Sequence, residues 1–108
     1  LALLQVRRGR VGEAADTLAA TARLAPDQPR YAYMHALALH RLGREDEALG
    51  VLARNPQHRD SLIAAATFER DRGRLAQAER HARAALALDP QDREAATLLA
   101  EIARRATR

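Results

Sequence analysis

A glycine, an alanine and a proline recur in the same order three times along this sequence of 108 residues. The three sets are Gly9, Ala14 and Pro26; Gly43, Ala48 and Pro56; and Gly73, Ala78 and Pro90. The separation of Gly9 from Gly43 equals that of Pro56 from Pro90. This period matches the length of about 34 residues that is typical of arrays of helical hairpins, in which each repeat is one pair of helices.

Glycine and proline have separate roles in such a unit. A glycine can take the left-handed conformation that ends a helix, and a proline cannot continue the helix that precedes it. Alanine and arginine are good helix formers, and the chain holds 26 alanines and 18 arginines. We therefore expect an all-α chain. The predicted helices are about 1–8, 12–25, 29–42, 45–54, 60–72, 75–88 and 93–106.

Apolar residues that recur at intervals of three and four predict the buried face of each helix. The predicted stripes are Ala14, Leu18 and Ala22; Ala32, His35, Ala36 and Leu39; Leu62, Ala65 and Ala66; Ala78, Ala82, Ala85 and Leu86; and Ala96, Leu99, Ala100 and Ala103. These stripes are narrow and rich in alanine, so each helix must pack closely on its neighbours to be stable. Asp92 is the expected N-cap of the last helix.

The three glycine, alanine and proline sets, together with Leu18 and Leu52 between them, resemble the tetratricopeptide repeat (TPR) family. The family pattern also favours a tryptophan, which is absent here, and a tyrosine where this chain has Gln5, Leu39 and Glu69. The resemblance implies an all-α, right-handed α-α superhelix (a TPR solenoid) of about three helical hairpins. The expected units are residues 1–28, 29–58 and 59–92, followed by a capping helix at 93–108.

The second unit is shorter than the others. The stretch from Ala48 to Pro56 lacks four of the residues that separate the matching alanine and proline in the other two units. Four residues are close to one helical turn, so their loss shortens the helix and nearly preserves its apolar face. Two interpretations stay open, a local kink or pocket with a function and a deletion that the fold tolerates.

By resemblance, the first helix of each hairpin lines a concave groove that binds a peptide or a protein segment. The expected groove residues are Arg30, Tyr33, Met34, Leu37, His40, Arg41, Asp60, Ile63, Thr67, Arg70, Thr97 and Glu101, with Asp71 and Leu98 beside them. Tyr33, Met34 and Leu37 form an apolar group off the predicted core stripe. The alternative is that Tyr33 and Met34 pack against the preceding hairpin.

Some members of the family grip the C-terminal carboxylate of a chaperone with Lys, Asn and Arg side chains. The matching positions of this chain hold Leu3, Met34, Asp60 and Ala64. None of these side chains donates strongly to a carboxylate. We therefore do not expect a chaperone tail as the ligand.

Two other binding hypotheses remain. Arginines gather at the predicted hairpin tips, where 11 arginines meet seven acids, and such an edge suits an anionic partner or a nucleic acid. No aromatic residues interleave with these arginines for base stacking, and cations at helix C-termini are common, so nucleic acid is the weaker hypothesis. Homodimerisation through Leu3, Leu4 and Val6 is the second hypothesis.

Catalysis, cofactors and metals are not expected. The chain has no cysteine, its four histidines do not have the spacing of metal ligands, and its one serine, Ser61, is at a predicted helix start. Besides His35, Glu69 is the one ionisable residue at a predicted core position, and we expect its role to be structural. The apolar stretches are far shorter than the roughly 20 residues of a membrane span. Since Leu1 begins inside an apolar pattern, we expect the chain to be a fragment. The resemblance to the TPR family implies that it is the C-terminal TPR part of a larger, bacterial protein.

Overall fold

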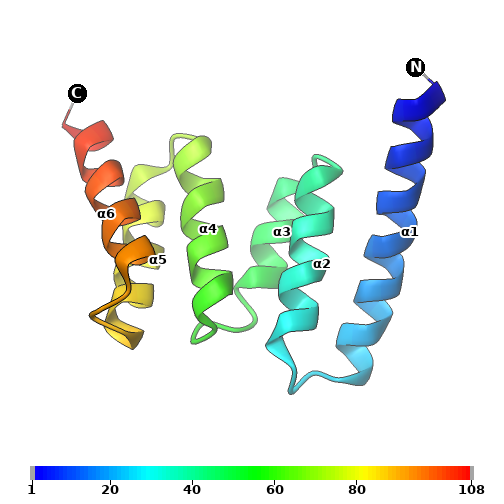
Figure 1. Cartoon of the computed structure of the whole chain (residues 1–108), viewed down its shortest axis with the longest axis horizontal. Coiled ribbons are helices and arrows are strands. Elements are labelled where there is room, and N and C mark those ends of the chain that lie inside the picture. The colour runs from blue at the N-terminus through cyan, green and yellow to red at the C-terminus, as the bar shows by residue number, and fades with distance from the viewer. Residues whose placement is uncertain (1, 108) are drawn as a thin grey trace. The chain divides into compact units, whose positions relative to one another are not determined.

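Every regular element that the structure describes is an α-helix (Figure 1). This computed structural model describes the backbone of residues 2–107 and the side chains of residues 9–107. The helices are α1 (Ala2–Leu24), α2 (Pro29–Arg41), α3 (Glu45–Leu52), α4 (Arg59–Asp71), α5 (Leu75–Leu88) and α6 (Arg93–Ala106). The all-α prediction is confirmed. Within the described range, no helix is both long and apolar enough to cross a lipid bilayer.

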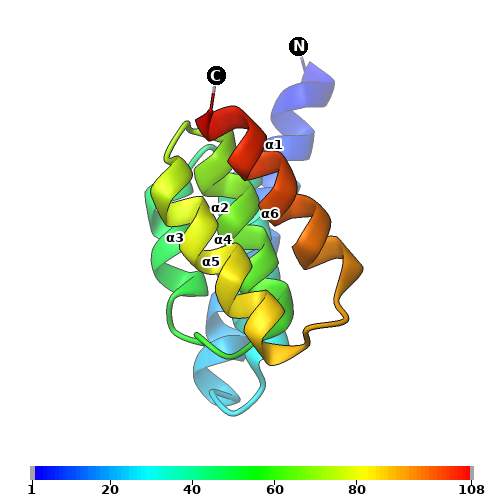
Figure 2. The same ribbon diagram turned by 90° about the vertical axis from the view of Figure 1, so that its left-hand side faces the viewer.

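The chain divides into two compact units, Leu1–Asn55 (unit 1) and Pro56–Arg108 (unit 2). In unit 1, α2 packs against both α1 and α3. In unit 2, α5 packs against α4 and α6, and α4 also contacts α6 (Figure 2). Each unit therefore builds its core from helices that follow one another along the chain.

Two glycines end helices as the sequence predicts. Gly43 and Gly73 have φ angles of 79° and 77°, in the left-handed region that favours glycine. After Gly43, the Arg44 N–H donates to the Leu39 carbonyl oxygen at 2.9 Å. The Arg74 N–H makes the matching bond to the Glu69 carbonyl oxygen at 2.8 Å. Both helix ends are thus closed by the hydrogen bonds of a Schellman motif.

The turn expected at Gly9 is wrong. Gly9 and Gly12 both lie inside α1, and Figure 1 shows this helix as one uninterrupted ribbon. Neither glycine has a positive φ. A glycine permits a turn but does not impose one, so the contacts of the flanking helices decide whether the chain reverses. The expected helix at residues 1–8 is here the first part of α1, and its side chains are outside the described residues.

Substitution of single glycines is expected to distinguish a glycine inside a helix, such as Gly9, from one at positive φ, such as Gly73. Gly9→Ala should raise the free energy of unfolding by about 0.5–1 kcal/mol, because alanine is the better helix former. Gly73→Ala should lower it by about 1–2 kcal/mol, because alanine is strained at positive φ. An added Cβ meets no atom within 4 Å at either position, so the difference is one of backbone alone. Urea titrations measure both values, and a destabilised Gly9→Ala variant would instead indicate a turn at Gly9.

The core of unit 2 is one cluster of small and aliphatic side chains. Its buried members are Leu62, Ile63, Ala66, Ala78, Ala82, Ala85, Ala95, Leu98 and Ile102. Ala66, Ala78, Ala82, Ala85 and Ala95 are 0% exposed. The predicted stripes of α4 and α5 are confirmed for Leu62, Ala65, Ala66, Ala78, Ala82 and Ala85, whereas Leu86 is half-buried.

The predicted buried face of α6 is wrong by one position. Ala95, Leu98 and Ile102 are buried, while Ala96, Ala100 and Ala103 are exposed and Leu99 is half-buried. Two apolar stripes with helical spacing run along this helix. The stripe that holds Leu98 and Ile102 removes more apolar area from water, and it is the one that packs on α5.

The core of unit 1 agrees with the prediction on α2 and differs on α1. Ala32, Ala36 and Leu39 are buried, and His35 is half-buried. Burial, followed by the charge of Arg54, lowers the pKa of His35. On α1, Ala15 is buried at 2% exposure, whereas Ala14 is exposed and Leu18 and Ala22 are half-buried. Helix α3 has eight residues, so the shortening in the second unit falls on this helix.

Candidate functional site

An apolar pocket of about 320 Å³ lies between α1 and α2 in unit 1. We call it the α1/α2 pocket. It is lined by Arg10, Val11, Ala14 and Leu18 of α1 and by Met34, Leu37, Ala38 and Arg41 of α2. Each helix contributes three apolar residues and one arginine. Such a lining combines an apolar surface with positive charge, which suits an amphipathic ligand with acidic groups.

Helical spacing brings the α2 residues of the pocket together. Positions three and four apart share one face of a helix, so Met34, Leu37, Ala38 and Arg41 form a single stripe. Met34 is 46% exposed, so a large part of its apolar side chain is accessible to a ligand. A methionine side chain adapts its shape to different ligands because it is unbranched and polarisable.

The structure does not bring the other three expected α2 residues to this pocket. The Arg30 guanidinium lies over the Tyr31 ring, 5.1 Å from its centroid, and donates to the Tyr31 hydroxyl at 3.4 Å. His40 Nδ1 is 3.7 Å from Glu45 Oε1 at the start of α3. Tyr33 is half-buried outside the pocket lining.

A second, more polar recess lies between α4 and α6 in unit 2, with a volume of about 430 Å³. We call it the α4/α6 recess, and it is lined by Arg70, Arg93, Glu94, Thr97, Leu98 and Glu101. Three expected groove residues meet here, namely Arg70, Thr97 and Glu101. Arg70 Nη1 donates to Glu101 Oε2 at 3.0 Å, and Glu101 also accepts from Arg105 at 3.2 Å. Two of the charges of this recess, those of Arg70 and Glu101, are therefore paired with each other.

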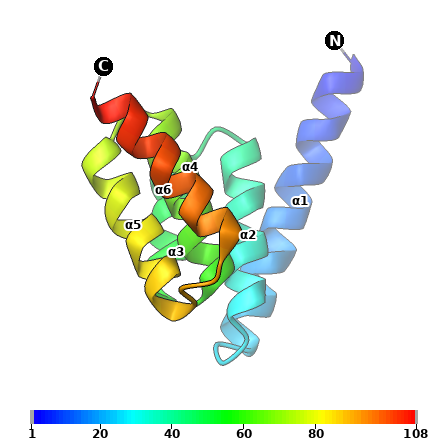
Figure 3. The same ribbon diagram turned by 60° about the vertical axis from the view of Figure 1, so that its left-hand side comes forward.

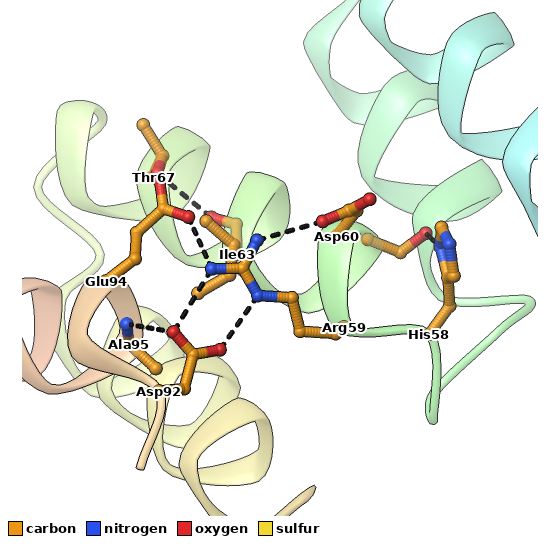
Figure 4. Close-up of polar contacts among 9 residues, drawn as sticks. His58, Arg59, Asp60, Ile63, Thr67, Asp92, Glu94 and Ala95 are labelled. Atoms are coloured by element: carbon orange, nitrogen blue, oxygen red, sulfur yellow. Dashed lines mark hydrogen bonds and ion pairs between the residues drawn. The ribbon is translucent and has the colours of Figure 1, made fainter. Parts of the chain in front are cut away.

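The remaining expected residues have structural contacts. Asp60 accepts a hydrogen bond from Arg59 Nη1 at 2.9 Å, and Thr67 donates to the Ile63 carbonyl oxygen at 2.9 Å (Figure 4). Asp71 accepts from Arg70 Nε at 3.1 Å. Ile63 and Leu98 differ from the expectation most clearly, because both belong to the buried core of unit 2 at 9% and 6% exposure.

An arginine joins the first turns of α4 and α6. Arg59 donates to both carboxylate oxygens of Asp92, at 2.8 and 3.1 Å, and also to Glu94 (Figure 4). Asp92 in turn accepts the Ala95 N–H at 3.1 Å, which confirms it as the N-cap of α6. The Arg59 bonds, followed by the Ala95 N–H, lower the pKa of Asp92 to about 2. This contact holds the two helices together at the end away from the Arg70 and Glu101 pair.

The sequence did not reveal every part of these sites. On α1, Ala14 and Leu18 were expected in the core, because they belong to an apolar stripe with helical spacing. The Arg59 contacts were also missed, although the separation of Arg59 and Asp92 along the chain is close to the repeat length. A search for opposite charges one period apart would have found this pair.

Few polar side chains of the described residues come together as they do in a metal-binding or catalytic site. Among residues 9–107, no three His, Asp or Glu side chains come together as metal ligands. The Ser61 hydroxyl lies 2.8 Å from His58 Nδ1. Ser61 is 1% exposed, so this hydroxyl group is out of reach of a substrate.

Comparison with known proteins agrees with this architecture. The tetratricopeptide repeat family matches the chain twice, at residues 1–58 and at residues 59–102. No curated protein is similar enough to be matched. Among solved structures, the first TPR of Spaghetti (RPAP3), bound to the HSP90 peptide SRMEEVD, superposes with a TM-score of 0.75 at 20% sequence identity. That match covers 95% of this chain and 85% of the other.

At 20% identity, this solved structure shows that the two chains share a fold. The family matches together include both units of the chain, and the match at residues 1–58 alone spans more than half of its length. They agree with helical pairs that are closed by glycine at Gly43 and Gly73. The chain belongs to the tetratricopeptide repeat family, whose domains generally act as non-catalytic modules for protein interaction.

Proposed function

We propose that this chain binds a peptide or a protein segment in the α1/α2 pocket and does not itself catalyse a reaction. The observation that carries the proposal is the pocket itself, in which Met34 and Leu37 give an apolar surface beside Arg10 and Arg41. Burial of one Met or Leu side chain contributes about 1.5–3 kcal/mol. A solved TPR domain of similar fold holds a peptide, which supports this class of ligand.

Four of the arginines at the hairpin tips favour this proposal over nucleic-acid binding. Arg44, Arg70, Arg74 and Arg105 are each paired with a carboxylate. Paired arginines contribute little to a positive potential, because the acids cancel their charge. The polar α4/α6 recess has the same property, so we expect it to add specificity for a ligand and little affinity.

The test is a peptide-display screen against the whole chain, followed by affinity measurements on the selected peptides. The double variant Met34→Ala and Leu37→Ala is expected to raise Kd at least about tenfold, because both apolar contacts are lost. Leu24→Ala is the matched control, since Leu24 is 87% exposed, lies on α1 and does not line the pocket. An unchanged Kd in a double variant with wild-type circular dichroism would contradict the proposal.

A further inference from the structure

Helices α1 and α2 of unit 1 correspond in sequence to α5 and α6 of unit 2. One and the same separation along the chain relates Gly9 to Gly73, Ala14 to Ala78, and Pro26 to Pro90. This separation pairs every residue of the α1/α2 pocket with a residue of unit 2. The pairs are Arg10 with Arg74, Val11 with Leu75, Ala14 with Ala78, Leu18 with Ala82, Met34 with Leu98, Leu37 with Glu101, Ala38 with Ile102 and Arg41 with Arg105.

In unit 2, four of the eight matching positions belong to the buried core. Ala78, Ala82, Leu98 and Ile102 are at most 6% exposed. They form one cluster with Leu62, Ile63 and Ala66 of α4. Figures 2 and 3 show α4 beside α5 and α6, the helices that carry these residues. Helix α4 therefore covers in unit 2 the surface that forms a pocket in unit 1.

The described part of unit 1 has no helix in that position. Helix α1 continues through Gly9 and Gly12, so the chain does not turn there toward the pocket. As a result, Ala14 is exposed and Met34 is 46% exposed, although Ala78 and Leu98 at the same repeat positions are buried. The pocket has the chemistry of a helix-packing surface, because alanine and aliphatic residues suit close contact between helices.

The contacts of α4 also indicate which polar groups a covering helix needs. Arg74 pairs with Glu69 of α4 at 3.6 Å, and its counterpart in the pocket is Arg10. Glu101 pairs with Arg70 of α4 at 3.0 Å, and its counterpart is Leu37. A helix that fits the pocket thus needs an acid at the position that Glu69 holds in α4, so that it can pair with Arg10. At the next position, where α4 has Arg70, it needs an aliphatic residue to face Leu37.

We propose that the α1/α2 pocket receives an amphipathic α-helix of a partner protein, in the position that α4 holds in unit 2. The inference rests on the proposed function and adds the form and the chemistry of the ligand. One face of this helix carries small and aliphatic residues, as Leu62, Ile63 and Ala66 do on α4. An acid on the helix pairs with Arg10, and the aliphatic residue after that acid packs on Leu37.

The probe is a peptide with the sequence of residues 59–71 and the substitution Arg70→Leu. A hydrocarbon staple between positions 61 and 65 keeps it helical, because an isolated helix of this length is marginal. These two positions lie outside the core cluster of unit 2. Met34 is the only methionine of the sequence, so its labelled methyl group reports on the pocket with one NMR signal. Binding to the whole chain is expected to shift this signal.

Two pairs of substitutions, each with one change in the peptide and one in the protein, test the contacts of the helix with Arg10 and Leu37. The Glu69→Lys form of the peptide is expected to bind about fivefold more weakly, and Arg10→Ala in the protein should remove that difference. The stapled peptide that keeps Arg70 should bind the wild-type chain more weakly than the leucine form. Leu37→Glu in the protein should reverse this order, because it recreates the pairing of Arg70 with Glu101. The inference would be overturned if Arg10→Ala did not remove the effect of Glu69→Lys and Leu37→Glu did not reverse the order of the two peptides.

A further peptide separates the inference from the proposed function. An unstapled form with Ala64→Pro keeps the apolar residues but cannot form the helix. If it binds as tightly as the stapled peptide, the pocket takes extended peptides, and only the helix is wrong. Both proposals fail if two results are obtained together. The first is that no peptide shifts the Met34 signal, and the second is that the double variant Met34→Ala and Leu37→Ala binds the selected peptides with unchanged Kd.

Discussion

Ile102→Ala is expected to lower the free energy of unfolding of unit 2 by about 3 kcal/mol. Ile102 is 1% exposed and is among the largest fully buried side chains of the described residues. It packs in one cluster with α4 and α5 residues, so its truncation leaves a cavity that close-packed helices cannot easily fill. Urea unfolding followed by circular dichroism measures this change.

Leu99→Ala is the control for Ile102→Ala. Leu99 is on the same helix but is only partly buried against the cluster, so its truncation should cost less than half as much. The comparison also tests the register of α6, since the sequence pattern alone predicted that Leu99 faces inward. A larger loss for Leu99→Ala than for Ile102→Ala would show that the other face of α6 is buried.

Asp92→Ala is expected to lower the midpoint of thermal unfolding by about 5 °C, because it removes both a helix cap and the carboxylate that Arg59 contacts. Asp92→Asn should have a smaller effect, because asparagine also caps helices but carries no charge. Glu79→Gln is the matched control. Glu79 pairs with Arg83 at 2.8 Å on the exposed face of α5, where an ion pair contributes little.

The Asp92 contact also makes stability depend on pH. Since the pKa of Asp92 is lowered to about 2 in the folded chain, the folded state holds this proton less tightly than the unfolded state. The contribution is therefore complete above about pH 4 and is lost as the pH falls toward about 2. Thermal unfolding at a series of pH values should show a loss in the wild-type chain that is smaller in Asp92→Asn. Equal pH profiles of the two proteins would contradict this role for Asp92.

The sequence predicted the candidate site only in part. Met34, Leu37 and Arg41 were expected on the exposed face of α2, and they line the α1/α2 pocket. Arg30 and His40 were expected beside them, but contacts with Tyr31 and Glu45 orient their side chains elsewhere. Helical spacing tells which residues share a face, whereas the direction of a long polar side chain depends on the partner that it meets.

Local residue patterns were enough to predict the helices α2 to α6, the turns at Gly43 and Gly73, and the cap at Asp92. These features depend on residues close together in the chain, namely glycine at positive φ, proline after a helix and a carboxylate three residues before the N–H that it accepts. Three features emerged only from the packing of the helices: the continuation of α1 through Gly9, the burial of Ile102 rather than Leu99, and the pocket beside Met34. Each of these outcomes depends on whether another helix packs against the residue, and neighbouring residues along the chain do not specify that packing.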